Sequence, residues 1–235
     1  EADLSQAEAR IVGYLAEDER LIDLFTRGQG FDIHAENAAH LFHYGKVGDV
    51  TKPERQVAKK LVHAANYGMG ALGFQDALRQ DFGMEVSRVE AERFLNLYHG
   101  RFPRIRMWHA QVEAELARSR ILTTPLGRKR RFFGRWNHDL LRDAYAFVPQ
   151  STVADILNRG LMALYQELPT VDEKARLVLT VHDSVVVECR PSHLHPVLRL
   201  LRARLERPVV IHRRTCTIPV EMKSGPTWAD LSPVT

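Results

Sequence analysis

Four polar side chains recur at every fourth position of one segment, "RQVAKKLVHAANYGMG". They are Arg55, Lys59, His63 and Tyr67. If the segment is a helix, these side chains form one slowly drifting row about 18 Å long. An extended nucleoside triphosphate has a similar length, so the cations could bind phosphates while the rings stack on sugar or base. A solvated helix face explains the same pattern when the segment is taken alone.

Two aspartates, Asp3 and Asp183, form the second candidate for chemistry. Asp183 belongs to a polar triplet between two β-branched apolar runs, Leu177–Val181 and Val185–Cys189. This pattern predicts a β-hairpin with Asp183 at its tip. A helix cap for Asp3 and a turn for Asp183 are the ordinary explanations. Two carboxylates presented in this way could also hold two Mg²⁺ ions for phosphoryl or nucleotidyl transfer.

Local signals place the row of four on a helix. Residues Thr51 to Glu54 form a capping box, which marks a helix start, and Gly68 follows as a stop signal. We therefore predict a helix from about Lys52 to Asn66.

A similar box, Ser5 to Glu8, predicts a helix that runs to about Glu17, and Glu1–Asp3 before it is too short for an edge strand. Helical spacing also predicts helices in "IHAENAAHLF", "SRVEAERFLNLYHG", 102–119, "STVADILNRGLMALYQEL" and "SHLHPVLRLLRARLE", and "CTIPVEMKSG" reads as a closing strand. Helices therefore fill the middle of the chain, and strands come late.

Composition is that of a globular protein. The chain has 235 residues, 45% of them hydrophobic, which is enough for one large domain or two small ones. No apolar run is long enough to cross a bilayer, and the first residues do not resemble a signal peptide, so we expect no membrane and a cytoplasmic location. Cys189 and Cys216 suggest neither a disulfide framework nor a zinc site. The net charge of +4 permits a polyanionic partner without requiring one.

Four motifs together carry a resemblance that none carries alone. In chain order they are "DLSQAEAR" from Asp3, the row of four with Gly68, "PQSTVADIL" from Pro149, and "VHDSVVVE" around Asp183. Their order and separations resemble motif A, motif B, the template-side glutamine segment and motif C of family A DNA polymerases, the bacterial DNA polymerase I family. The resemblance covers nearly the whole chain and looks most like the phage-type members.

The resemblance implies an α+β fold, a right-hand polymerase palm with an antiparallel sheet into which helical fingers are inserted. Residues 1–20 would be palm with motif A, 21–120 fingers, and 121–235 palm with the motif C hairpin. The thumb and the exonuclease-like domain of the family would be absent from this chain. It would be the C-terminal portion of a polymerase in a bacterial or phage-infected cell.

The implied activity is template-directed DNA synthesis, in which dNMP is added to a primer 3′-hydroxyl and pyrophosphate is released. Asp3 and Asp183 would bind two Mg²⁺ ions, while Arg55 and Lys59 would hold the triphosphate and Lys59 would protonate the leaving group. Glu8, together with Tyr67, would exclude a 2′-hydroxyl.

Other positions match residues around the substrates. Gln6, Gln150 and His182 resemble residues at the primer terminus and the minor-groove edge of the new base pair. His34 matches a phosphate contact. The basic run with Arg128 and Arg130 suits a duplex backbone, although a solvated loop explains it nearly as well.

The chain departs from the family pattern at two informative positions. His63 replaces the usual Phe or Tyr, which keeps a flat ring but leaves dideoxynucleotide discrimination open. Ser184 replaces the Glu of the motif C triplet, which puts a secondary carboxylate in doubt but not the two aspartates.

Two other functions remain open. A single-subunit RNA polymerase shares the aspartates and the row of four, but a sugar-selecting Glu8 has no use there. A non-catalytic DNA-binding fragment of a split polymerase would also keep the fold. The expected partners are primer-template DNA, dNTPs and the missing N-terminal thumb and exonuclease-like part.

Overall fold

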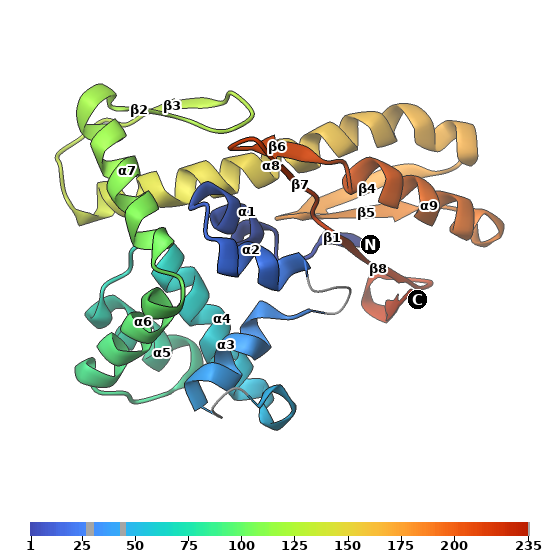
Figure 1. Cartoon of the computed structure of the whole chain (residues 1–235). Coiled ribbons are helices and arrows are strands. Elements are labelled where there is room, and N and C mark those ends of the chain that lie inside the picture. Colours follow the sequence, from blue (N-terminus) through green and yellow to red (C-terminus); the bar gives the residue numbers. More distant parts are fainter. Residues whose placement is uncertain (27–30, 43–45, 235) are drawn as a thin grey trace. The chain divides into compact units, whose positions relative to one another are not determined.

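The computed structural model describes residues 1–26, 31–42 and 46–234 (Figure 1). The chain divides into two units, Glu1–Ile11 with Gln150–Thr235, and Val12–Pro149. We call them the sheet unit and the helical unit. Both borders fall inside helices, α1 (Ala7–Leu15) and α8 (His138–Val171). They differ from the borders after residues 20 and 120 at which the sequence analysis divided palm from fingers, and that division stays a prediction.

The sheet unit is built on a five-stranded antiparallel sheet in the order β4-β5-β1-β8-β9. The strands are β1 (Ala2–Leu4), β4 (Arg176–Val181), β5 (Ser184–Glu188), β8 (Val220–Ser224) and β9 (Ser232–Pro233). The hairpin β4–β5 confirms the prediction made from the two apolar runs around Asp183.

The first strand corrects the interpretation of the N-terminal residues. β1 is only three residues long, yet it pairs with β5 on one side and β8 on the other, and Ala2 and Leu4 are buried. The helix α1 begins at Ala7, because Gln6 has a left-handed φ of 53° and its carbonyl accepts the N–H of Arg10. The predicted capping box is wrong, since Ser5 lies outside the helix and its hydroxyl donates to Glu221 at 2.6 Å.

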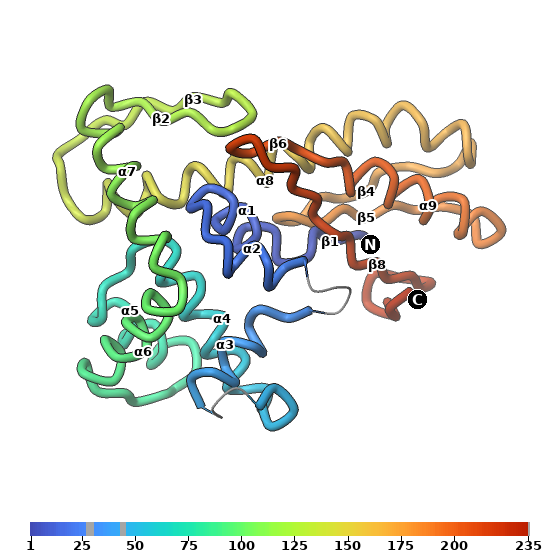
Figure 2. Tube along the Cα trace, viewed as in Figure 1, coloured from blue at the N-terminus to red at the C-terminus, as the bar shows by residue number. Residues whose placement is uncertain are grey.

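Helices and a second hairpin complete the sheet unit. They are the C-terminal part of α8, η2 (Pro191–His193), α9 (Leu194–Leu205), β6 (Val209–Ile211), β7 (Arg214–Cys216) and η3 (Trp228–Asp230). α9 packs on β8, and α8 approaches α9 so closely at Gly160 that a Cβ there would lie 2.7 Å from Leu205. The first residue and Val234 both lie beside β8 (Figure 2), since the Glu1 ammonium donates to the Lys223 carbonyl and the Val234 N–H donates to the Met222 carbonyl.

The helical unit is an assembly of short helices and one hairpin. After the C-terminal part of α1 come α2 (Glu19–Thr26), α3 (Ile33–Phe42), η1 (Val47–Asp49), α4 (Lys52–Asn66), α5 (Ala71–Phe82), α6 (Arg88–Arg101), α7 (Arg104–Ser119), β2 (Ile121–Thr123), β3 (Lys129–Arg131) and the N-terminal part of α8. α3 packs on α4, and α6 packs on both α4 and α5. The largest fully buried side chains of this unit are Leu21, Leu24, Ile33, Leu61, Phe74, Leu78, Phe102, Ile105 and Leu116. The α+β class is confirmed.

The helix whose bounds were predicted best from local sequence signals is α4. It spans Lys52–Asn66 as predicted, and Thr51 and Glu54 form both hydrogen bonds of the capping box. We did not predict α5, although Gly70 and Gly83 lie at its ends as caps. A solvated loop at the basic run is wrong for Lys129–Arg131, because these residues pair with Ile121–Thr123 as a hairpin.

Within the described ranges, none of the helices has the length and apolar character to cross a membrane.

Candidate active site

The sheet unit brings Asp3 and Asp183 together from opposite ends of the chain. Asp3 is the middle residue of β1 and pairs across the ladder with Ser184, the residue after Asp183. The backbone N–H of Leu4 donates to the Asp183 carbonyl at 3.2 Å. The tight turn forms because His182 adopts φ 57° and the Ser184 hydroxyl donates to the Val181 carbonyl at 2.9 Å. Both carboxylates therefore sit on rigid backbone.

The electrostatics around Asp3 are those of crowded negative charge. Partial burial and, to a smaller extent, the nearby carboxylates of Asp183, Glu221 and Glu1 together raise the pKa of Asp3 to about 6. Glu221 lies directly opposite Asp3 on β8. Like charges at this distance repel, so the site favours a cation or a proton.

Glu221 is a site residue that the sequence analysis missed. Its signal was the alternation in "VEMK", where Val220 and Met222 are buried and Glu221 is exposed. That alternation marks a strand with Glu221 on its outer face, but only the pairing of β1 with β8 puts this carboxylate beside Asp3.

His182 and Glu8 join the same site. The His182 ring lies 3.1 Å from an oxygen of Asp183 through Nδ1 and 3.7 Å from an oxygen of Glu8 through Nε2. Glu8 is in the first turn of α1, where its side chain is 16% exposed. Gln6 lies in the turn before α1, and its amide donates to the Ser5 hydroxyl at 3.4 Å. Gln150 is exposed on α8.

The carboxylates of Asp3 and Asp183 suit a hard cation that is also bound by substrate. They do not form a site in which the protein alone supplies all the ligands. Across residues 1–26, 31–42 and 46–234, no group of three or more His, Cys, Asp or Glu side chains could hold a metal ion. Mg²⁺, however, usually binds through one or two carboxylates and keeps waters or substrate phosphates as its other ligands. Asp3 and Asp183 fit that requirement.

The helical unit holds the row of four as predicted, on one face of α4. Lys59 and His63 are exposed, Arg55 is partly exposed and Tyr67 is buried at the C-terminal cap. The His63 and Tyr67 rings meet edge to face with centroids 4.6 Å apart. The helix therefore presents its cations to solvent and anchors the end of the row in the core.

Arg55 has a partner that the sequence analysis missed. Its guanidinium pairs with Asp32 at 2.5 Å, and this ion pair lowers the pKa of Asp32 against the effect of partial burial. Asp32 also caps α3, since it accepts the backbone N–H groups of His34 and Ala35. The fourfold spacing of cations gave no sign of a carboxylate on the neighbouring helix.

His34 lies close to the row of four. Burial, together with the charges of Arg55 and Lys59, lowers the pKa of His34 to about 4 against the opposing effect of Asp32. The imidazole is therefore neutral at pH 7, and its Nδ1 is buried without a hydrogen-bond partner among the described residues.

The predicted duplex-binding residues lie at the β2–β3 hairpin. Arg128 is exposed directly before β3, and its backbone forms hydrogen bonds with Thr124. The Arg130 guanidinium pairs with Asp143 at 3.3 Å and lies over the Phe132 ring. Arg130 is therefore already engaged within the helical unit.

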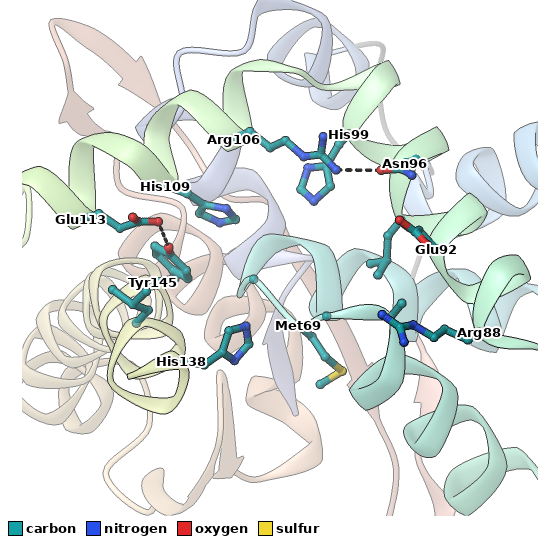
Figure 3. A pocket seen from close by; sticks show the side chains of 15 residues that line it. Met69, Arg88, Glu92, Asn96, His99, Arg106, His109, Glu113, His138 and Tyr145 are labelled. Atoms are coloured by element: carbon teal, nitrogen blue, oxygen red, sulfur yellow. Dashed lines mark hydrogen bonds between the residues drawn. The ribbon is translucent and has the colours of Figure 1, made fainter. Parts of the chain in front are cut away.

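A pocket of about 560 Å³ opens in the helical unit beyond the end of α4 (Figure 3). His99, His109 and Tyr145 contribute rings to its wall, and the Tyr145 hydroxyl donates to Glu113. Burial lowers the pKa of His99 to about 3 and also lowers that of His109. The rings of His99 and His109 are thus neutral, but charged side chains also line the wall: Arg88, Glu92, Arg106 and Glu113. The predicted site residues are not among its lining residues.

Comparisons with known proteins identify the family. The family model for DNA polymerase family A matches residues 1–230. The chain is 29% identical to DNA polymerase I of Geobacillus stearothermophilus, covering 97% of this chain and 26% of that protein. It is 31% identical to DNA polymerase I of Chloroflexus aurantiacus, covering 99% of this chain and 24% of that protein.

A solved structure agrees with this. The POL domain of Pol1 from M. smegmatis, in complex with DNA primer-template and dNTP, superposes with a TM-score of 0.79 at 25% identity, covering 93% of this chain and 38% of that one. This chain belongs to DNA polymerase family A. It spans about a quarter of the length of the curated relatives.

Proposed function

We propose that this chain carries the nucleotidyl-transfer site of a DNA polymerase, which adds dNMP to a primer 3′-hydroxyl under the direction of a template. The observation that supports it most is the pairing of β1 with β5, which holds Asp3 beside Asp183 in a field of negative charge. In the reaction the primer 3′-oxygen attacks the α-phosphorus, and the bond from that phosphorus to pyrophosphate breaks.

Asp3 and Asp183 are the proposed ligands of two Mg²⁺ ions. When bound, these ions supply charge neutralisation and a lowered pKa of the primer hydroxyl. The chain's own contribution is to hold both carboxylates on paired strands, so little reorganisation is needed during the reaction.

The row on α4 is the proposed triphosphate-binding set. Lys59 would bind the phosphates and donate a proton to the leaving oxygen, and Arg55 would pair with them after leaving Asp32. His63 would stack on the sugar, and His34, neutral at pH 7, would donate one hydrogen bond to a phosphate.

Selection of deoxyribose is assigned to Glu8 and Tyr67, and contact with the primer terminus and the new base pair to Gln6, Gln150 and His182. Arg128 and Arg130 would contact the backbone of duplex DNA. The remaining thumb and exonuclease-like parts of a polymerase would act as the partner of this chain.

Primer extension on a primed DNA template with Mg²⁺ tests the proposal. Asp183→Asn keeps the size of the side chain and removes the charge, and Asp49→Asn on η1 is the matched control at an exposed carboxylate. We expect Asp183→Asn to lower extension by at least about a hundredfold and Asp49→Asn to leave it unchanged. Use of dNTPs in preference to rNTPs is expected from Glu8.

Two results would contradict the proposal. One is undiminished extension by Asp183→Asn. The other is no extension by the unaltered chain even when the N-terminal part of a family A polymerase is supplied.

A further inference from the structure

The β2–β3 hairpin has one packed face and one open face. Side chains alternate along a strand, and Arg130 and Phe132 share the packed face, with the Arg130 guanidinium 4.6 Å from the Phe132 ring centroid. Phe132 is 4% exposed and meets Phe147 of α8 edge to face. Lys129, Arg131 and Phe133 therefore occupy the opposite face, and all three are exposed.

The segment around this hairpin is uniformly cationic. Residues 120–136 include six Lys or Arg side chains and no Asp or Glu. They are Arg120, Arg128, Lys129, Arg130, Arg131 and Arg135. The Arg130 side chain is 47% exposed, and Asp143, which pairs with it, offsets part of its charge. Such a surface attracts a polyanion.

Two large rings stand in solvent beside these cations. Phe133 is 80% exposed and Trp136 is 46% exposed. The turn that carries them is braced by Arg120, which donates to the Gly134 carbonyl at 3.2 Å and whose guanidinium lies 5.6 Å from the Trp136 ring centroid. These two contacts of Arg120 fix the position of the Trp136 ring. The ring is therefore exposed in a defined conformation of the turn.

We propose that the open face of the β2–β3 hairpin binds single-stranded DNA, with bases stacked on Phe133 and Trp136 and phosphates paired with Lys129 and Arg131. The choice of DNA as the polyanion rests on the proposed function. The residues of this site are different from the two aspartates and from the row of four.

Single strands fit this face better than a duplex does. Stacking on a side-chain ring needs a base whose flat face is free, and bases inside a duplex are already stacked on their neighbours. Lys129 and Arg131 of β3, and Phe133 two residues after its end, follow at two-residue steps of about 7 Å, a repeat that suits an extended polynucleotide backbone. Stacking is tolerant of sequence, so little base preference is expected.

Fluorescence anisotropy with the full chain tests the site, using labelled oligodeoxythymidine of about 20 nucleotides and a blunt DNA duplex as probes. The variant Phe133→Ala/Trp136→Ala should bind the single strand about tenfold or more weakly, and duplex binding should not change. Tyr165→Ala, which removes a ring that is 77% exposed elsewhere, is the matched control and should bind like the unaltered chain.

The phosphate contacts have their own readout. The logarithm of the single-strand binding constant falls linearly with the logarithm of the salt concentration. In Arg131→Ala this negative slope should become less steep by about 0.7. Arg199→Ala removes an exposed cation of α9 and should leave that slope unchanged. Circular dichroism checks that each variant is folded.

Unchanged single-strand affinity in the folded double variant would overturn the inference, and so would an equal loss for duplex. These results can be separated from failure of the proposed function by primer extension with the same samples. A chain that extends primers but binds single strands without the two rings overturns only the inference. A chain that binds through the rings but never extends, even when complemented, overturns only the proposed function.

Discussion

At the scale of single residues, the candidate site depends on which charges lie beside each other. Arg55 illustrates this, because its sequence context suggests a free cation on a helix face and the structure pairs it with Asp32. Asp3 illustrates the opposite case, because a residue that could have been a helix cap lies among three other carboxylates. Asp32 beside Arg55, and Asp183 and Glu221 beside Asp3, come from distant parts of the chain.

The Arg55–Asp32 pair predicts a competition with dNTP. Asp32→Asn removes the charge that holds Arg55, while Asn still caps α3 nearly as well as Asp. A partly exposed pair contributes about 0.2–1 kcal/mol, so we expect dNTP binding to tighten by about 1.4- to fivefold. Equilibrium binding of dNTP, followed by calorimetry, measures this effect.

The control for this prediction is Asp81→Asn. This variant breaks the ion pair between Asp81 and Lys60. Lys60 also lies on α4, next to Lys59, but it is not one of the row of four. Unaltered or weaker dNTP binding in Asp32→Asn would argue that Arg55 does not bind the triphosphate.

At the scale of elements, the end of α4 is held against α8 by a glycine. Gly68 has φ +68°, and a Cβ there would lie 2.6 Å from the Tyr145 ring. Tyr145 also stacks on His109 with centroids 4.1 Å apart, so the ring has little freedom to move away. Glycine therefore meets two requirements at this position: it adopts the positive φ without strain, and it has no Cβ to collide with the Tyr145 ring.

Gly68→Ala should lower the free energy of unfolding by about 1–3 kcal/mol, since it adds left-handed strain and overpacking. Gly100→Ala on α6 is the matched control, because nothing lies within 4 Å of its Cβ. Alanine there should be neutral or stabilising by up to about 1 kcal/mol. Urea unfolding of both variants measures the difference, and equal stabilities would refute the role given to Gly68.

At the scale of the whole molecule, the buried carboxylate of Asp172 in the sheet unit makes the stability of the fold depend on pH in the acid range. Burial acts to raise the pKa of Asp172, but the backbone N–H groups of Arg190 and Lys174 and the Arg190 guanidinium overcome it and hold the pKa at about 2. The end of α8 is thereby tied to the segment after β5. The stabilisation is complete above the ordinary pKa of 3.8 and is lost as the pH falls through about 2.

Urea midpoints between about pH 2 and pH 5 test this linkage. The free energy of unfolding of the unaltered chain should fall as the pH falls in this range. In Asp172→Asn this free energy should depend less steeply on pH, because up to one proton fewer is taken up on unfolding. Glu173→Gln, which alters a more exposed carboxylate beside Arg190, should keep the slope of the unaltered chain. An equal slope in Asp172→Asn would show that this carboxylate is not responsible.

Features whose causes are local were predicted from the sequence alone. The bounds of α4 follow from Thr51, Glu54 and Gly68, which act within a few residues of the helix ends. The β4–β5 hairpin follows from two apolar runs that bracket a two-residue tip. The motifs also identified the family correctly.

Features that depend on distant partners were decided only by the tertiary structure. β1 is a strand because β5 and β8 supply hydrogen bonds to both of its edges, whereas three residues carry too little periodicity to predict one. The same pairing set Glu221 beside Asp3, and the packing of α3 on α4 set Asp32 beside Arg55. Ladder hydrogen bonds and charge pairs act between residues far apart in the chain, so no local pattern records them.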